Sequence, residues 1–465
     1  MTETMEKPAV RAVLEALQPL LGDRLVATQA VREHHGRDTS YHAPALPDAV
    51  AFPRTEAEVQ EIVRACAAHD VPIVPFGAGS SVEGHTIPTR GGLSVSTREM
   101  SAIVEVRPED QLAVVQPGVT RKQLNTELRA TGMMFSVDPG ADASLGGIAS
   151  TRGSGTMSYR YGTMRDNVLG LRAVTADGEV VKTGSRARKS ATGYDLTHLF
   201  VGAEGTLGVI TELTVRLHPV AEAITSASCT FGSVEDAVNS VIELVQYGIP
   251  AARVEFLDEV AIAAVNAYSK LDLPVAPTLL FEFHGTEDWA AEQARIAEAI
   301  CADHGGAGFA WSADADERGR LWAARHDLYF ATKAIEPGKE LYTGDICVPI
   351  SRLAESIMAA RADIDRSYLT GQVVGHVGDG NYHASYLIRP GNQEDLAEAN
   401  RLADLMVGRA LEMGGTASGE HGLGLGKLKF MRREHGDAAV LAMQAIKRAL
   451  DPKGLMNPGK LGMAG

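Results

Sequence analysis

The spacing of apolar residues changes once along the chain, near residue 222. Before this point, short apolar runs separated by turn residues, such as LSVS, AIVEV and LAVVQPG, predict strands over residues 93–117. Beyond it, apolar runs alternate with stretches of helical spacing, beginning with SASCTF and a helix from Ser233. The pattern predicts an α+β chain with a second α+β domain after residue 222.

Capping residues and helical spacing predict the main helices. Thr55, with Glu58 three residues later, predicts one helix start, and Thr120 predicts a helix over 120–131. Longer helices are predicted near 314–335 and 393–413. The final segment, DPKGLMNPGKLG, is apolar enough to pack back on the body of the protein. The opening helix has an apolar face made of Val10, Val13, Leu14, Leu17 and Leu20.

Composition narrows the class of protein. The chain has 44 Lys+Arg and 59 Asp+Glu, a formal net charge of −15, so its field repels nucleic acid and anionic lipid. No apolar run approaches the roughly 20 residues that span a bilayer, and the start lacks a signal-peptide core. We therefore expect a cytoplasmic protein without a membrane span, whose membrane contact, if any, is peripheral to the inner membrane. The four cysteines form no CxxC pair, which indicates a reducing compartment and no iron–sulfur cluster.

The 48 glycines concentrate in loops at 77–92, 138–170 and 414–426. The first loop contains Gly77-Ala78-Gly79, but it leads into a strand rather than a helix and lacks the last glycine of the GxGxxG dinucleotide fingerprint. Such a loop is either an ordinary turn or a nest of N–H groups that holds a pyrophosphate. The second loop is long and nearly free of apolar periodicity, which is rare in a compact domain without a ligand. Together the two loops predict one long ligand. No internal repeat of 20–50 residues is visible.

The stretches PFGAGSSVEGH, DPGADASLGG, GSGTMSYRYGTMRDNVLG and VGAEGTLGVITEL resemble the FAD-binding domain of the vanillyl-alcohol-oxidase-type (PCMH-type) flavoproteins. Within that family the chain is most similar to the branch of FAD-linked D-lactate dehydrogenases (cytochrome) and glycolate oxidase D-subunits, from about residue 45 to 461. The resemblance implies a two-part PCMH-type FAD-binding domain, a ferredoxin-like α+β substrate (cap) domain and a C-terminus that returns to the FAD domain.

The resemblance also assigns segments and FAD contacts. The expected segments are an N-terminal helical segment (1–44), the FAD-binding domain (45–221), the cap domain with a metal site (222–426) and a C-terminal segment (427–465). Some relatives tie the flavin to a histidine in the first loop, where this chain has serines, so we expect non-covalent FAD and a structural role for His85. The implied FAD-binding residues are Pro75, Phe76, Gly77, Ala78, Gly79, Ser80, Ser81, Pro139, Gly140, Ala141, Ser144, Gly147, Ser154, Gly155, Tyr161, Gly162, Glu204, Gly205, Gly208, Ile210 and Asn457.

A histidine pair flanks a predicted hairpin turn. VVGHVGDGNYHASYLI has apolar flanks around Asp379-Gly380, and a two-residue turn there places His376 opposite His383. Directly opposite residues have Cβ atoms about 4.5–5.5 Å apart, a separation that suits two imidazoles on one divalent metal. A stacked or hydrogen-bonded pair of strand histidines is the structural alternative.

The Gly-flanked dipeptide Glu420-His421 adds two further candidates. A loop glutamate is usually just solvated, but here Glu420 supplies the carboxylate of a two-His, one-Glu metal site and leaves His421 as a base. In the resembled family the corresponding histidines and glutamate bind a zinc- or manganese-like ion, and the neighbouring histidine takes the substrate proton. The family likewise uses the arginine at the position of Arg325 to bind the substrate carboxylate, although alone a helix arginine is more often part of a salt bridge.

These parts predict oxidation of a D-2-hydroxy acid, with proton removal by His421 and hydride transfer to the flavin. An external acceptor, such as a cytochrome, a quinone or an electron-transfer flavoprotein, has to reoxidise the flavin. YTGDICVPISRL resembles the lactate branch, and Thr343 stands where 2-hydroxyglutarate enzymes have a lysine, so D-lactate is the predicted substrate. The alternatives are glycolate or D-2-hydroxyglutarate, a non-redox flavoprotein transferase of the alkyl-dihydroxyacetone-phosphate synthase type, or a colourless metallohydrolase.

Overall fold

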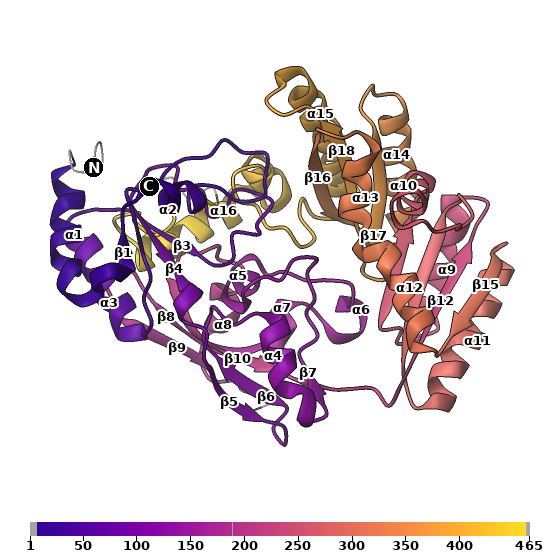
Figure 1. Cartoon of the computed structure of the whole chain (residues 1–465), viewed down its shortest axis with the longest axis horizontal. Coiled ribbons are helices and arrows are strands. Elements are labelled where there is room, and N and C mark those ends of the chain that lie inside the picture. Colours follow the sequence, from indigo (N-terminus) through magenta and orange to yellow (C-terminus); the bar gives the residue numbers. More distant parts are fainter. Residues whose placement is uncertain (1–6, 188, 462–465) are drawn as a thin grey trace. The chain divides into compact units, whose positions relative to one another are not determined.

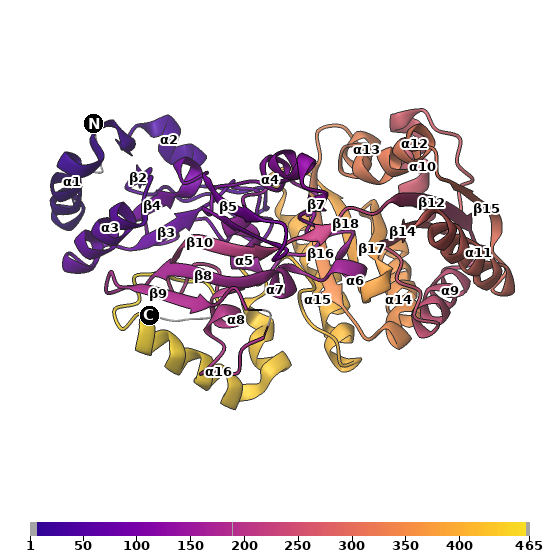
Figure 2. The same cartoon turned by 90° about the horizontal axis from the view of Figure 1, so that it is seen from below.

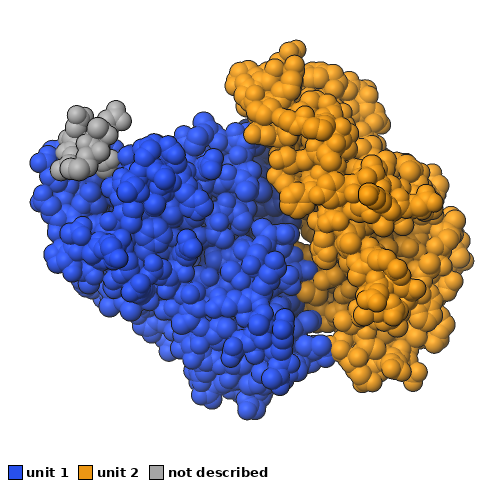
Figure 3. All heavy atoms as spheres, viewed as in Figure 1, with its two compact units in different colours: residues 1–154, 162–220, 420–465 blue, residues 155–161, 221–419 orange. Residues whose placement is uncertain are grey.

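The computed structural model describes residues 7–187 and 189–461 and divides into two compact units (Figure 3). The first unit comprises residues 1–154, 162–220 and 420–465, and the second comprises 155–161 and 221–419. Compared with the predicted segments, the N-terminal 44 residues belong to the first unit, and the chain re-enters that unit at Glu420 rather than at 427. A short piece, Gly155–Tyr161, belongs to the second unit.

The first unit contains a four-stranded sheet in the order β1-β2-β4-β3 and a five-stranded antiparallel sheet in the order β5-β6-β10-β8-β9 (Figure 1). β2, β4 and β3 run parallel, and β7 and β11 form a small separate pair. The strands are β1 (Leu25–Val26), β2 (Ala49–Ala51), β3 (Ile73–Phe76), β4 (Leu93–Ser96), β5 (Ile103–Arg107), β6 (Leu112–Val115), β7 (Met133–Met134), β8 (Val168–Val174), β9 (Val180–Gly184), β10 (Val209–Arg216) and β11 (His218–Pro219).

Local signals set several of these elements. The Thr55 hydroxyl accepts from the Glu58 N–H at 3.2 Å at the start of α3, and Thr120 caps α4 in the same way, as predicted. β8 and β9 form a hairpin around Asp177-Gly178, a dipeptide typical of such turns, and Gly178 takes a φ of +79°. No helix lies between β3 and β4, which confirms that the first Gly loop does not follow the dinucleotide fingerprint.

Three details of this unit differ from the predictions. In α1, Leu21 rather than Leu20 completes the buried face, and Leu20 is 40% exposed. The stretch 138–170 contains helices of four to seven residues, which are too short to show a period in the sequence. A C-terminal helix, α16, was not predicted, because Gly436 interrupts its pattern with a φ of +76°. The helices of the unit are α1 (Pro8–Leu21), α2 (Gln29–His34), α3 (Glu56–Ala68), α4 (Arg121–Glu127), α5 (Leu145–Thr151), α7 (Met164–Asn167), α8 (Leu196–Phe200) and α16 (Met431–Leu450).

The second unit is built on one antiparallel sheet in the order β15-β12-β14-β13-β17-β18-β16. Its first four strands form the β-α-β-β-α-β order 4-1-3-2 of a ferredoxin-like fold, which confirms that prediction. The other three strands, β17, β18 and β16, repeat the order 2-3-1 of the same fold. A bridge between Cys347 and Thr416 takes the place of their fourth strand. The strands are β12 (Ala223–Thr230), β13 (Arg253–Leu257), β14 (Thr278–Gly285), β15 (Ala307–Ser312), β16 (Glu340–Cys347), β17 (Gly371–His376) and β18 (Asn381–Ile388).

The two faces of this sheet differ in chemistry. Figure 2 shows α9, α11, α14 and α15 on one face and α10, α12 and α13 on the other. The first face is apolar, with Phe281 and Phe283 on one strand and Tyr382 and Tyr386 on another, all fully buried. The opposite face carries buried Glu, His and Asp side chains, so any polar chemistry of this unit belongs there. The helices are α6 (Ser158–Tyr161), α9 (Val234–Gln246), α10 (Glu259–Ser269), α11 (Glu287–Asp303), α12 (Ala315–His326), α13 (Leu328–Ile335), α14 (Leu353–Asp365) and α15 (Gln393–Glu412).

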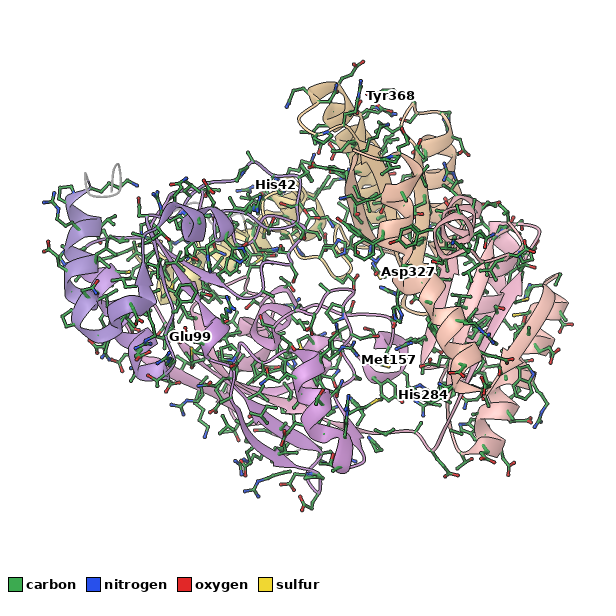
Figure 4. All side chains as sticks on the ribbon, viewed as in Figure 1. His42, Glu99, Met157, His284, Asp327 and Tyr368 are labelled. Carbon is green, nitrogen blue, oxygen red and sulfur yellow. The ribbon has the colours of Figure 1, made fainter. Side chains whose placement is uncertain are left out.

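The helix predicted near 314–335 is two helices, α12 and α13, which meet at Asp327 (labelled in Figure 4). The Asp327 carboxylate accepts from the Ser269 hydroxyl at 2.9 Å, a contact with α10 that fixes the break. Apolar spacing continues across the break, so the sequence pattern could not reveal it. In the described ranges no helix is both long and apolar enough to cross a bilayer.

Candidate active site

The first two Gly-rich loops of the first unit lie against each other and against the stretch VGAEGTLGVITEL, which contains Glu204 and Gly205. A Cβ added to Gly77 would overlap the Ser144 hydroxyl, so the first loop packs on the second with no room for a side chain. The Glu204 N–H donates to the Ser150 carbonyl at 2.8 Å, and Gly205 packs on Pro75. These contacts agree with the prediction that the loops serve one long ligand.

A cavity of about 270 Å³ opens beside this junction. It is lined by Phe76, Gly77, Ala78 and Ser144 from the predicted FAD set, and the buried Ser144 hydroxyl has no hydrogen-bond partner among the described residues. A buried donor beside glycine backbone suits a pyrophosphate or ribose oxygen, so the residues fit FAD. His34, His35 and Arg98 also line the cavity and were not predicted, because their spacing in the sequence gives no signal.

A buried ion pair between His85 and Glu204 fixes the first Gly-rich loop to the stretch VGAEGTLGVITEL. Burial alone would lower the pKa of His85, but Glu204, with Oε1 3.3 Å from Nε2, raises it above the usual value. The same contact holds the pKa of Glu204 below its usual value despite complete burial. The Asn457 amide donates to the carbonyls of both residues at 3.0 and 2.6 Å. The C-terminus thus returns to this unit as predicted, and His85 has a structural partner.

The loop that carries Glu420 and His421 packs on this pair. The backbone N–H of Leu423 donates to Glu204 at 2.7 Å, and a Cβ on Gly422 would come within 2.7 Å of His85. Glu420 accepts from the Ser154 hydroxyl at 2.6 Å, and its Oε1 lies 3.6 Å from His421 Nε2. The first unit therefore joins the predicted base to residues of the predicted FAD site.

His376 and His383 do lie together in the second unit, but not in the predicted register. A 3-10 turn at Val377–Asp379 lengthens the hairpin, so Val374 is the residue opposite His383. The two histidines are diagonal neighbours on one face, with ring centroids 5.4 Å apart and planes at 84°. The predicted pairing of 376 with 383 is wrong, whereas the predicted shared face is confirmed because the shift is two residues.

His376 instead lies opposite Glu255 of β13. His376 Nδ1 donates to Glu255 Oε1 at 2.5 Å, and Arg325 Nε donates to Glu255 Oε2 at 2.7 Å. Burial alone would raise the pKa of Glu255, but His376 and Arg325 together hold it below the usual value. The structure thus connects the predicted metal ligand and the predicted carboxylate-binding residue through a glutamate that the sequence did not identify.

Asp345 contacts His383, as Glu255 contacts His376. It lies opposite His383 in the β16–β18 pair, with Oδ1 3.6 Å from Nδ1. Asn381 donates to the same oxygen at 2.7 Å, and the Ser418 hydroxyl donates to Oδ2 at 2.8 Å. Gly419 packs directly on Asn381. Asp345 thereby fixes the position of Ser418 and, through Asn381, of Gly419, the residue directly before Glu420.

A second polar cluster occupies the same sheet face in its first half. Tyr161 donates to His284 Nδ1 at 2.6 Å, and His284 Nε2 lies 2.8 Å from Glu282 (His284 is labelled in Figure 4). Arg253 lies 3.4 Å from Glu282 and over the Trp322 ring. Tyr161, predicted to bind FAD, therefore has its hydroxyl engaged within the second unit.

The predicted site residues divide between the units. Arg325, His376 and His383 belong to the second unit, and Glu420 and His421 to the first. Of the predicted FAD set, Gly155 and Tyr161 belong to the second unit. The remaining FAD candidates lie in or beside the loops of the first unit: Phe76, Gly79, Ser80, Ser81, Pro139, Gly140, Ala141, Gly147, Gly162, Gly208 and Ile210.

Comparison with known families assigns the chain. Residues 47–184 match the FAD binding domain family, and residues 220–461 match the family described as FAD linked oxidases, C-terminal domain. A Danio rerio protein named probable D-lactate dehydrogenase, mitochondrial, is 47% identical over 97% of this chain and 92% of its own length. An Arabidopsis thaliana protein named D-lactate dehydrogenase [cytochrome], mitochondrial, is 44% identical over 98% of this chain and 81% of its own length.

The solved structures agree on the fold. p-Cresol methylhydroxylase with substrate bound has a TM-score of 0.82 and 19% identity, covering 98% of both chains. The chain belongs to the FAD-linked oxidases. It is an FAD-binding oxidoreductase with a PCMH-type FAD-binding domain and a ferredoxin-like second unit.

Proposed function

We propose that this protein oxidises a D-2-hydroxy acid, with D-lactate as the first choice and pyruvate as the product, and that a divalent metal assists. The observation that carries the proposal is the contact chain Arg325–Glu255–His376, with His383 beside it, on the polar face of the second unit. A 2-hydroxy acid has a carboxylate, which an arginine can bind, and a neighbouring hydroxyl, which a metal held by two histidines can bind. The names of the relatives support lactate as the substrate.

The donor set fits a zinc- or manganese-like ion. Because His376 uses Nδ1 for Glu255, it would bind a metal through Nε2, which is the usual arrangement for a histidine oriented by a carboxylate. Glu420, attached directly to Gly419 beside Asp345 and Asn381, is the proposed third ligand. When bound, such an ion lowers the pKa of a hydroxyl group that it contacts.

In the proposed reaction, residues of the chain bind the substrate carboxylate, accept the hydroxyl proton and hold the FAD. Arg325 binds the substrate carboxylate and orients the molecule. His421 accepts the hydroxyl proton as Cα gives up its hydride. FAD, held non-covalently by the first unit, supplies the hydride acceptor. An external acceptor, such as a cytochrome, a quinone or an electron-transfer flavoprotein, regenerates the oxidised flavin.

Substrate size is the finer part of the proposal. Thr343 lies in β16, two residues from Asp345, and its hydroxyl is 3.2 Å from that of Ser385. A threonine at this position provides no cation for a second carboxylate, which favours a small monocarboxylate.

The deciding experiment is anaerobic reduction of the purified protein. Flavin bands near about 370 and 450 nm should bleach on addition of D-lactate, and L-lactate should leave them intact. A yellow protein that D-lactate, glycolate and D-2-hydroxyglutarate all fail to reduce would contradict the proposed function. Dialysis against a strong chelator should stop D-lactate turnover and leave the flavin bound; full activity without metal would remove the metal from the proposal.

A further inference from the structure

We infer that Glu255 is a positioning residue that sets the spacing between the hydroxyl-binding and carboxylate-binding groups of the site, and so selects acids with the hydroxyl on the carbon next to the carboxylate. The inference rests on the proposed function, because His376 and Arg325 have those roles only there. No part of the predicted site included Glu255.

The geometry of Glu255 carries the argument. The residue is fully buried in β13, directly opposite His376 of β17. Its two carboxylate oxygens are used separately: Oε1 accepts from His376 at 2.5 Å, and Oε2 accepts from Arg325 at 2.7 Å. One rigid carboxylate on a central strand therefore fixes the distance between an imidazole and a guanidinium that come from two different elements.

Each contact with Glu255 determines which atoms of His376 and Arg325 face the proposed metal and substrate. With Nδ1 bonded to Glu255, His376 presents Nε2 as its metal-binding atom. With Nε bonded to Glu255, Arg325 presents its Nη1–Nη2 edge as the fork for a substrate carboxylate. A 2-hydroxy acid has one carbon between these two oxygen functions, and a 3-hydroxy acid has two. A fixed spacing matches only one of them well.

The same sheet face supplies a matched control. Glu282, on the adjacent strand β14, is 6% exposed and also contacts one histidine, His284 at 2.8 Å, and one arginine, Arg253 at 3.4 Å. Neither partner of Glu282 is a predicted ligand or substrate contact. Replacing Glu282 thus reproduces the loss of a buried, paired carboxylate without touching the proposed spacing.

The test compares Glu255→Gln with Glu282→Gln in the full-length flavoprotein. For each we would measure FAD content, binding of Zn²⁺ or Mn²⁺ alone, the KM for D-lactate and the inhibition constant of D-3-hydroxybutyrate. Glu255→Gln should weaken metal binding about 10–100-fold and raise the KM for D-lactate about tenfold, with FAD content unchanged. The inhibition constant of D-3-hydroxybutyrate should change little, so discrimination between the two acids narrows. Glu282→Gln should leave all four values within about threefold.

Two results would overturn the inference. One is a Glu255→Gln enzyme with parental metal affinity and parental discrimination. The other is an equal loss in Glu282→Gln, which would make Glu255 a merely structural residue. If Glu255→Gln fails to fold, Glu255→Asp keeps the charge but is too short for both contacts, and the same narrowing of discrimination is expected. A parent enzyme that oxidises no 2-hydroxy acid contradicts the proposed function instead, so the two failures are distinguishable.

Discussion

The two halves of the seven-stranded sheet follow the same chain path but end differently. In each half a histidine of the polar face contacts a buried glutamate that also contacts an arginine. In the first half these are His284, Glu282 and Arg253. In the second half His376 contacts Glu255, which belongs to the neighbouring first-half strand β13 and also contacts Arg325. In the first half Tyr161 takes the remaining ring nitrogen of His284. In the second half another histidine lies beside His376. A structural cluster and a candidate reactive cluster thus differ by a single neighbouring side chain.

The fourth strand differs as well. In the first half it is β15, a full strand paired with β12. In the second half it is reduced to the single bridge of Thr416 to Cys347, after which the chain leaves the sheet with SGEHG. Because the strand is short, the residues predicted as ligand and base lie in the loop that follows it. The comparison shows that the predicted ligand and base follow the point where one copy of the repeated topology is incomplete.

The largest effect is expected from the loop that follows the shortened strand. His421→Ala should lower kcat for D-lactate by about 10²–10⁴, the usual contribution of a general base, with FAD and metal content near the parental values. Single-turnover flavin reduction together with metal analysis checks this. A variant that loses its metal, or that reduces its flavin at the parental rate, would show that His421 is a ligand or a bystander.

The second-largest effect is a difference between the variants of the two halves' histidines, His376 and His284. His376→Ala should lose the metal and lower kcat/KM about 10³-fold, because several kcal/mol of stabilisation disappear with the ion. His284→Ala should keep the metal and lose thermal stability instead, since it leaves Glu282 and Tyr161 without a shared partner. Metal content and Tm of the two variants measure the contrast, and similar metal loss in both would abolish it.

Substrate size gives a smaller effect in the second half. D-2-Hydroxyglutarate should have a kcat/KM about 10²-fold below that of D-lactate, because Thr343 offers no cation to its second carboxylate. Thr343→Lys should narrow this difference. Lys333 and Lys339 are the first residues to examine if the two acids are used equally well; Lys339 pairs with Glu336 at 2.7 Å.

The smallest effect concerns stability and pH in the first half. Burial alone would raise the pKa of Glu282, but His284 and Arg253 hold it below the usual value. A carboxylate with a lowered folded-state pKa stabilises the protein above its unfolded pKa, and this stabilisation is lost as the pH falls through the folded value. Glu282→Gln should therefore lower the free energy of unfolding by about 1.5–3 kcal/mol at pH 7, and the difference should shrink below a pH of about 4.5.

Denaturant unfolding of this variant from pH 7 to pH 3 would test the sign. The exposed Glu298→Gln is the control, with an expected change within about 0.5 kcal/mol at every pH. A Glu282→Gln deficit that grows in acid would contradict the expected direction.

Local features were predictable from the sequence, and non-local ones were not. The caps at Thr55 and Thr120 depend on residues three apart, so the sequence contains the whole signal. The shared face of His376 and His383 was predictable for the same reason, whereas their register depended on a 3-10 turn with no distinct sequence signal. Glu255 could not be found, because its position beside His376 arises from pairing of strands more than a hundred residues apart.

The return of the C-terminus to β3 has a consequence for how the protein is made. Ile73 exchanges backbone hydrogen bonds with Leu455 and Asn457, and Asn457 in turn holds the carbonyls of His85 and Glu204. During synthesis, the residues of the second unit emerge from the ribosome complete while the first unit still lacks its last segment. The first unit can finish folding, and its loops can reach their final contacts, only after Asn457 has been translated. Premature termination before Asn457 would therefore disrupt a cofactor site whose loops were translated hundreds of residues earlier.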